Sequence, residues 1–262
     1  MTILSALISV VFLGSSAASE KKPSVEARIF KNKSGNTLPY RLFKPANYDP
    51  KQTYPLVLCL HGAGGRGTDN KSRGTVAFKA LSNAKVQTKH PAFLLTPQCP
   101  KDKKWVNTNW EKGSYSISKL PVSKELELVE QILDLVEERF PIDSSRIYVT
   151  GQSMGGYGTW DIILRHPKKF AAAIPVCGAG DPTEVKGIAH LPIWAFHGDR
   201  DTVVPTKGSR EMVAALKKAG CNIKYTEYKG VGHNSWSRAW KEKELVPWLF
   251  KQHNKAIDSD KN

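Results

Sequence analysis

The sequence predicts a single α/β domain with a mainly parallel sheet and helices on both faces. Short, continuously apolar runs recur along the chain, and segments with helical periodicity alternate with them. Strands of a parallel sheet are apolar throughout because both faces of the sheet are buried, and helices connect one strand to the next. A length of 262 residues with 40% apolar content is enough for one substantial core.

The N-terminal part of this domain is expected to form an antiparallel edge. Strand candidates at 25–30 and 38–43 flank Asn-Lys-Ser-Gly-Asn at 32–36, which has the composition of a hairpin turn. From residue 54 onwards the two kinds of segment alternate. The expected strands are 55–60, 92–96, 146–150, 170–176, 191–196 and 223–228, and the expected helices are 124–140, 155–165, 207–219 and 238–252.

The helix predicted at 124–140 has the clearest pattern. Leu126, Val129, Leu133 and Val136 recur at three- and four-residue steps, and Glu side chains occupy many of the other positions. We therefore expect this helix to bury one face and expose the other, and to end at the proline that follows it.

The first residues have the pattern of a secretory signal peptide. Residues 2–14 are apolar and small residues follow up to Ser19, although no Lys or Arg precedes the run. A membrane-spanning helix would need ~20 apolar residues. No repeat or long linker divides the rest. We expect a signal peptide at 1–19, one domain at 24–253 and a polar tail at 254–262, and hence a secreted or periplasmic protein without a stable membrane span.

The composition narrows the classes of partner. The formal net charge is +15, but the basic residues are spread along the chain and no zinc-finger, helix-turn-helix or RNA-binding signature occurs. A specific nucleic-acid ligand is therefore not expected. Four cysteines could form two disulfides after export, yet Cys59 and Cys177 lie in apolar strand-like runs, so we expect mostly free, buried thiols. Neither a metal nor a cofactor is expected from the residue spacings.

The most informative segment is Gly-Gln-Ser-Met-Gly at 151–155. It follows an apolar strand and leads into a helix, which is the setting of a Gly-x-Ser-x-Gly nucleophile elbow. Its glycines leave space around the hydroxyl of Ser153 at a strained turn. A five-residue motif also arises by chance, so this interpretation needs partners elsewhere in the chain.

A second glycine-rich segment, 61–67, follows the strand at 55–60. It matches Gly-x-Gly-x-x-Gly from Gly62, but no acidic residue lies between Asp69 and Asp102 to bind a ribose, and the Gly-Lys-Ser/Thr of a P-loop is absent. A nucleotide-binding loop is therefore disfavoured. We expect the backbone amides of this segment to face a developing oxyanion.

A serine nucleophile needs a base, and the base needs a carboxylate to orient it. In folds built around this elbow the chain order is Ser, then the acid, then His. Asp199 and Asp201 follow the strand at 191–196, and both are candidates for the acid. Of the later histidines, His233 lies in a glycine-rich loop and His253 lies at the end of the terminal helix, so His233 is the expected base.

Three segments together resemble a known family. Gly-Gln-Ser-Met-Gly-Gly-Tyr-Gly-Thr-Trp at 151–160, His-Gly-Asp-Arg-Asp-Thr-Val-Val-Pro at 197–205 and Gly-Val-Gly-His-Asn-Ser-Trp at 230–236 resemble secreted α/β-hydrolase esterases of the polyhydroxybutyrate-depolymerase-like, feruloyl-esterase-like and "predicted peptidase" group. The resemblance implies an α/β-hydrolase fold over nearly the whole chain. It also implies the triad Ser153, Asp201 and His233, and an oxyanion hole from the backbone N–H of Met154 with that of Ala63 or Gly64.

The expected activity is hydrolysis of carboxylic esters through a Ser-His-Asp acyl-enzyme, on a small-molecule or polysaccharide-linked ester. Trp110 and Trp236 are candidate substrate-binding residues, and packing of long loops is the competing interpretation for both. Two other functions stay open from the sequence: a serine peptidase of small peptides and a non-catalytic ligand-binding module.

Overall fold

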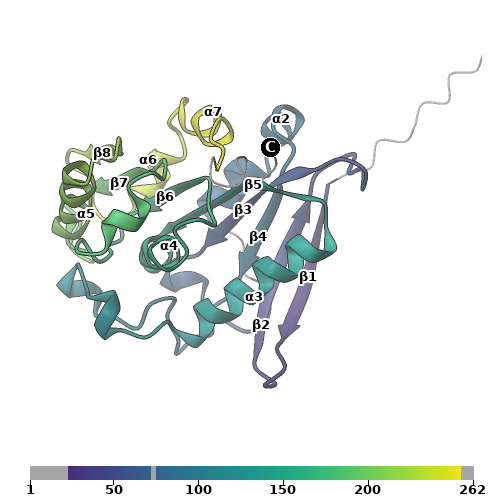
Figure 1. The fold of residues 1–262 in the computed structure, drawn as a ribbon, viewed down its shortest axis with the longest axis horizontal. Coiled ribbons are helices and arrows are strands. Elements are labelled where there is room, and N and C mark those ends of the chain that lie inside the picture. The colour runs from purple at the N-terminus through teal and green to yellow at the C-terminus, as the bar shows by residue number, and fades with distance from the viewer. Residues whose placement is uncertain (1–22, 72–74, 255–262) are drawn as a thin grey trace, which may run out of the picture.

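The computed structural model describes residues 23–71 and 75–254. In this part of the chain, helices cover both faces of an eight-stranded sheet of order β1-β2-β4-β3-β5-β6-β7-β8 (Figure 1). Its strands are β1 (Ser24–Lys31), β2 (Thr37–Lys44), β3 (Tyr54–Leu60), β4 (Phe93–Pro97), β5 (Ile142–Gln152), β6 (Ala172–Val176), β7 (Trp194–Gly198) and β8 (Lys224–Tyr228). The predicted α/β class is confirmed, whereas the predicted signal peptide at 1–19 lies outside the described residues.

The strands β1 and β2 form a hairpin at one edge of the sheet. Lys31 pairs with Thr37, and Gly35 in the turn has a φ of 82°, which L side chains rarely adopt. β2 is also antiparallel to β4, and every neighbouring pair from β4 to β8 is parallel. The predicted antiparallel edge is thus confirmed, and the parallel strands bring their carboxyl ends to one edge of the sheet.

Helices account for most of the connections. The α-helices are α1 (Val76–Leu81), α2 (Ala84–Lys89), α3 (Lys124–Arg139), α4 (Met154–Arg165), α5 (Thr206–Lys218), α6 (Trp236–Ala239) and α7 (Leu245–Phe250). Short 3-10 helices are η1 (Ala63–Gly65), η2 (Trp110–Lys112), η3 (Ile117–Lys119) and η4 (Val185–Ile188). In α3 the hydroxyl of Ser123 caps the first turn by accepting the N–H of Leu126 at 3.1 Å, and the predicted apolar positions are buried.

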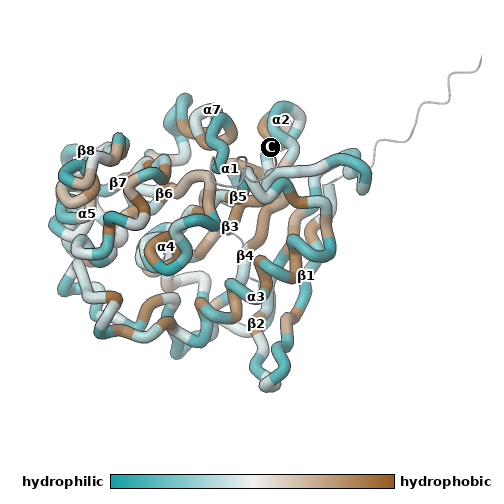
Figure 2. The backbone as a smooth tube through the Cα atoms, in the orientation of Figure 1, coloured by the Kyte–Doolittle hydropathy of each residue, from teal (hydrophilic) through white to brown (hydrophobic). Residues whose placement is uncertain are grey.

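Alternate side chains of the central strands enter two separate cores. In β3, Leu56, Leu58 and Leu60 belong to the first core, and Val57 and Cys59 to the second, as the two-residue period of a strand requires. Helices α3, α4 and α5 close the first core, and α1, α6 and α7 close the second. The hydrophobic colouring of these strands reflects burial on both faces (Figure 2).

Some element boundaries differ from the prediction. The single helix predicted at 238–252 is wrong, because α6 and α7 are separated by a turn over 240–244. The Lys-Glu-Lys-Glu run at 241–244 has no apolar side chain to bury, and the chain there forms tighter bonds such as the N–H of Glu242 to the carbonyl of Ala239. Helices α1 and α2 were not predicted, because six residues show too little periodicity.

The packed domain extends one residue further towards the C-terminus than the predicted boundary at residue 253. Asn254 was assigned to the polar tail, but it is buried: its backbone N–H bonds to Ser145 at 2.8 Å, and its side-chain amide bonds to Lys168 at 2.6 Å. The rest of the predicted tail, 255–262, lies outside the described residues. Among the described helices, none combines the length and apolar character that crossing a membrane requires.

Candidate active site

Ser153 stands at the turn between β5 and α4 with a φ of 56° and a ψ of −119°. This strained conformation requires small neighbours, because a Cβ on Gly151 would lie 2.2 Å from the carbonyl oxygen of Gly155. A Cβ on Gly155 would likewise lie 2.1 Å from that of Leu60. The predicted elbow geometry is therefore present, and each of these glycines is needed to let the helix approach the sheet.

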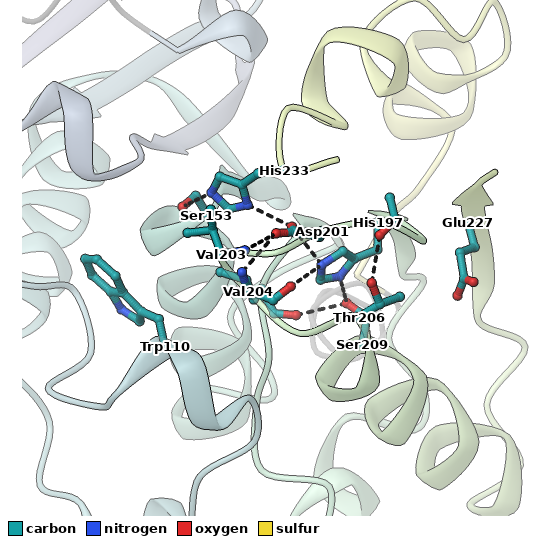
Figure 3. Close-up of polar contacts among 12 residues, drawn as sticks. Trp110, Ser153, His197, Asp201, Val203, Val204, Thr206, Ser209, Glu227 and His233 are labelled. Carbon is teal, nitrogen blue, oxygen red and sulfur yellow. Dashed lines mark hydrogen bonds and ion pairs between the residues drawn. The ribbon is translucent and has the colours of Figure 1, made fainter. Parts of the chain in front are cut away.

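A continuous chain of hydrogen bonds runs from this serine to the end of β7 (Figure 3). Ser153 Oγ lies 2.8 Å from Nε2 of His233, and Nδ1 of His233 lies 2.7 Å from Oδ2 of Asp201. The three side chains come from the turn after β5 and from the loops after β7 and β8. Residues separated by 80 positions in the chain meet because parallel strands end at the same edge of the sheet.

The carboxylate of Asp201 is fully buried and densely hydrogen-bonded. Its Oδ1 accepts the backbone N–H groups of Val203 and Val204, both at 2.9 Å, and its Oδ2 contacts His233 and His197. Burial alone would raise the pKa of Asp201, but hydrogen bonds from His197, His233 and the two amides outweigh it and hold that pKa well below its usual range. Asp201 is therefore ionised at neutral pH.

The other acid candidate from the sequence points elsewhere. Asp199 accepts the backbone N–H of Gly230 at 2.7 Å on the exposed side of the loops. The structure therefore brings Asp201, and not Asp199, to His233. His253, the other candidate base, lies near the end of the described chain after α7.

The segment after β3 packs directly against the elbow. A Cβ on Gly62 would lie 3.4 Å from Cβ of Ser153, and Ala63 and Gly64 line the same cleft as Ser153. Met154 and Ala63 stand at the first positions of α4 and η1. Backbone amides in the first turn of a helix have no partner within the helix, so they are free to receive an oxyanion.

His61 holds this segment in place. Its Nε2 accepts the backbone N–H of Cys99 at 3.0 Å, so the ring proton is on Nδ1, which donates to the carbonyl of Gly62 at 2.7 Å. The indole N–H of Trp105 bonds to the carbonyl of His61 at 2.9 Å. Burial lowers the pKa of His61 to about 4, so the ring is neutral under ordinary conditions.

A cleft of about 720 Å³ opens above Ser153. Trp110 and Trp236, the two predicted substrate residues, both line it. The ring of Trp236 meets that of His233 edge-on, with centroids 5.2 Å apart. Trp105 is completely buried beside His61 and serves packing. Charged side chains also reach the cleft, namely Arg66, Asp69, Lys71 and Lys79.

The cysteines are free and buried, as the sequence predicts. Burial raises the pKa of Cys59 and of Cys99 to about 12, so these thiols stay protonated. In the part of the chain that the structure describes, the one group of three possible metal ligands is Cys177, Asp201 and His233. Two of these already bond to each other in the chain that leads to Ser153.

One residue of this site was not identified from the sequence. His197 belongs to β7, is completely buried, and contacts Asp201 at 3.1 Å through Nε2. The available signal was a histidine at the end of the apolar run Trp-Ala-Phe at 194–196. Buried imidazoles need hydrogen-bond partners, so this position could have been flagged as part of a polar network.

Comparisons with known proteins agree with this geometry. The family model described as "Putative esterase" matches residues 32–202. A probable feruloyl esterase C of Aspergillus niger is 28% identical over 208 residues, which are 76% of this chain and 68% of that protein. A bifunctional acetylxylan esterase/xylanase of Neocallimastix patriciarum is 25% identical over 177 residues, 67% of this chain and 23% of that protein.

Among solved structures, a thermostable esterase superposes with a TM-score of 0.80 at 40% sequence identity. The match covers 87% of this chain and 63% of that protein, so this chain corresponds to less than two thirds of its length. The fold is thus the α/β-hydrolase fold, and the elbow, the buried acid and the loop histidine lie where that fold carries its active site. The chain belongs to the family described as "Putative esterase" and is a carboxylic-ester hydrolase.

Proposed function

We propose that the chain cleaves esters in which a feruloyl, acetyl or similar acyl group is attached to a polysaccharide, through a Ser-His-Asp acyl-enzyme mechanism. The observation that carries the proposal is the hydrogen-bonded chain of Ser153, His233 and Asp201 at the base of an open cleft. A binding module has no need of a serine, a base and an acid in this order and contact.

The mechanism has two acyl-transfer steps. Ser153 Oγ attacks the ester carbonyl carbon while His233 Nε2, 2.8 Å away, takes the hydroxyl proton. The negative charge on the tetrahedral intermediate is received by the N–H of Met154 and of Ala63 or Gly64. His233 then gives its proton to the leaving alcohol, and an acyl-enzyme remains. In the second step His233 activates water, which releases the acid and restores Ser153.

Asp201 controls the base during both steps. Its bond to Nδ1 of His233 keeps the lone pair of Nε2 directed at Ser153 and stabilises the imidazolium that forms. The carboxylate is itself fixed by the amides of Val203 and Val204, so little reorganisation is needed when charge develops.

Both the cleft and the relatives support the proposed substrate class. The cleft is open and is lined by aromatic, glycine and charged residues, which suits part of a large polar substrate. Trp110 and Trp236 offer ring surfaces to an aromatic acyl group or a sugar ring. Relatives named as feruloyl and acetylxylan esterases support these acyl groups. The signal-like pattern at 1–19 supports export of the protein to the outside of the cytoplasm, which is where such polymers are found.

The decisive experiment is hydrolysis of p-nitrophenyl acetate and butyrate by the protein without residues 1–19, beside Ser153→Ala prepared identically. We expect turnover in the parent and a loss of about 10⁴-fold or more in the variant. Feruloyl, acetyl-xylan and hydroxybutyrate esters would then be compared. A folded parent without esterase activity would refute the proposal.

The same assay separates the alternatives. A serine peptidase would cleave the amide of a given acyl group as well as the ester, because the leaving amine is then protonated effectively by His233. A binding module would not react with a serine-directed phosphonate, whereas the proposed nucleophile should be labelled at Ser153, and mass spectrometry would locate the adduct.

A further inference from the structure

His197 is the second imidazole that contacts the catalytic acid candidate. It lies in β7 with no exposed surface, and its ring has a close polar neighbour at each nitrogen (Figure 3). Nδ1 lies 2.8 Å from Oγ of Ser209 in α5. Nε2 lies 3.1 Å from Oδ2 of Asp201 and 3.1 Å from the carbonyl of Val204. These partners determine which ring nitrogens carry protons.

At Nδ1 the proton belongs to the histidine. A serine hydroxyl has a single hydrogen, and Ser209 donates it to the carbonyl oxygen of Gly178 at 2.9 Å. A carbonyl oxygen can only accept. Were Ser209 to donate to His197 instead, two oxygen lone pairs would face each other at 2.9 Å in a buried site, which is costly. The Ser209 oxygen is therefore an acceptor, and Nδ1 of His197 donates to it.

At Nε2 the proton also belongs to the histidine. Both neighbours of this nitrogen are acceptors, because Val204 offers a carbonyl and Asp201 is ionised. A bare Nε2 lone pair would be repelled by both oxygens, whereas an N–H shared between them satisfies the contact. With hydrogens on both nitrogens, the ring is a cation.

We propose that His197 is a buried imidazolium, paired permanently with Asp201, that positions this carboxylate and lowers the proton affinity of His233. His197 touches no substrate and acts through Asp201, so it is a positioning residue. The inference rests on the proposed role of the Ser153–His233–Asp201 chain.

The charges around His197 are consistent with an ion pair. Asp201 faces it from the loop after β7, and a buried charge requires such a partner. Glu227 is its register neighbour on β8 and is bound to Arg210 of α5, with side-chain bonds of 2.6 and 2.9 Å. Cys177, after β6, is a protonated thiol because burial raises its pKa. His233 lies beyond the shared oxygen of Asp201.

The consequence concerns the pH range of the enzyme. His233 and His197 contact the same oxygen of Asp201, at 2.7 and 3.1 Å. A fixed positive charge at that distance disfavours a second positive charge on His233, so the base stays neutral and active at lower pH. Removal of this charge should move the acid limb of the kcat/KM profile upwards by about one pH unit or more.

The first test observes the protons of the unmodified enzyme. In protein labelled with ¹⁵N-histidine, the signals of His197 are assigned by their absence in His197→Gln, at about pH 7.5, where an unperturbed imidazole is mostly neutral. We expect both ring nitrogens of His197 to give protonated signals. One deprotonated nitrogen would overturn the proposal, and this result does not depend on activity or on a variant's catalytic fitness.

The second test measures the pH profile of His197→Gln with p-nitrophenyl acetate. The amide nitrogen of Gln can still donate to Asp201, so the variant removes the charge while keeping a hydrogen bond. His166→Gln is the matched control, since His166 caps the C-terminal end of α4 and pairs with Glu130 of α3 at 2.8 Å, beside a cavity that contains none of Ser153, Asp201 and His233. We expect the acid limb to shift only in His197→Gln, with a loss at the plateau of about tenfold or less.

The outcomes separate the two proposals. An unshifted acid limb in folded, active His197→Gln contradicts a fixed charge on His197. An inactive parent enzyme contradicts the proposed function, and the NMR result alone then tests whether His197 is protonated at both nitrogens. If His197→Gln does not fold, His197 is assigned from ¹⁵N couplings in the parent protein, and the protonation of its two nitrogens still decides the matter.

Discussion

The two sides of the cleft are held by different kinds of interaction. On the side of the proposed oxyanion hole, which we call the oxyanion side, His61, Gly62 and Gly65 form a packed unit: a Cβ on Gly65 would lie 2.6 Å from the ring of His61, and that ring bonds to the carbonyl of Gly62. The indole of Trp105 packs against the ring of His61 and donates a hydrogen bond to its carbonyl. Close packing of this kind leaves no room for displacement.

On the base side, His233 depends mainly on hydrogen bonds. Its side chain is 21% exposed and lies in the loop between β8 and α6. The bond to Asp201 and the edge contact with Trp236 orient the ring, and the loop is tied to Arg200 through the carbonyl of Val231 at 2.9 Å. In the proposed mechanism His233 gains and loses a proton in every cycle and therefore needs access to substrate and water, whereas the amides only receive charge and benefit from rigidity.

The largest effect is expected on the base side, from Asp201→Asn. The amide would leave Nδ1 of His233 without its acceptor and favour the wrong tautomer, so kcat should fall by about 10⁴-fold. The pH dependence and kcat are measured with p-nitrophenyl butyrate, and Asp199→Asn is the matched control, because its carboxylate accepts the backbone N–H of Gly230 and is not part of the hydrogen-bonded chain to Ser153. Near-normal activity in Asp201→Asn would show that His233 is oriented by something else.

The next effect is expected on the oxyanion side, from Gly65→Ala. The added methyl would meet the His61 ring at 2.6 Å and push it off Cys99 and Gly62, which would displace the amides that we propose as the oxyanion hole. A misplacement of this kind should cost about 10²-fold in kcat/KM. Gly187→Ala is the control, because its nearest neighbours would be 3.8 Å away. An unchanged kcat/KM in folded Gly65→Ala would refute the packed-unit description.

A third prediction concerns the acid stability of the same side. The pKa of His61 is about 4 in the folded protein and about 6.5 when unfolded, so the unfolded chain binds the extra proton first. The free energy of unfolding should therefore fall as pH drops from about 6.5 to about 4, by about 3 kcal/mol from this group. Above that window the contribution is fully present.

The measurement is urea unfolding at several pH values for the parent and for His61→Gln. The variant is expected to be less stable at neutral pH, because Cys99 and Gly62 lose their partner, but to lack this part of the slope. The difference between the two curves removes the contribution of carboxylates and other histidines. Parallel curves would contradict the lowered pKa of His61, because they would mean that this ring takes up its proton over the same pH range in the folded and unfolded states.

Much of the fold follows from the sequence because its signals are local. Apolar runs identify β3 to β7, since these strands are buried on both faces, and helical periodicity identifies α3, α4 and α5. Helices α1 and α2 were missed because their capping residues, Thr75 and Asn83, precede fewer than two full turns. The turn between α6 and α7 was missed because the flanking residues are apolar on both sides.

In the candidate site, too, the residues with local sequence signals could be predicted and those that depend on distant partners could not. Ser153, Asp201 and His233 could be nominated because each lies in a short motif with a fixed chain order, and the structure brings all three into contact. The proposed role of His197 could not be predicted, because it depends on the hydroxyl of Ser209, 12 residues away in the chain. That hydroxyl in turn bonds to the carbonyl of Gly178, which follows β6. Proton positions require partners that only the folded chain brings together.

The smallest expected effect separates the two tryptophans of the cleft. Trp110 lines the cleft from η2, whereas Trp236 also contacts the ring of His233. Trp110→Ala should raise KM for feruloyl-sugar esters by about three- to tenfold and leave p-nitrophenyl acetate unaffected, because only the larger substrate reaches that ring. Trp236→Ala should also lower kcat for both substrates, since the ring of His233 would lose its edge contact with the indole.

Steady-state kinetics on the two esters test this prediction. The control is Trp248→Ala, because the ring of Trp248 packs on that of Trp194 outside the cleft. Equal losses on both substrates in Trp110→Ala would mean that this residue supports the loop and does not bind substrate.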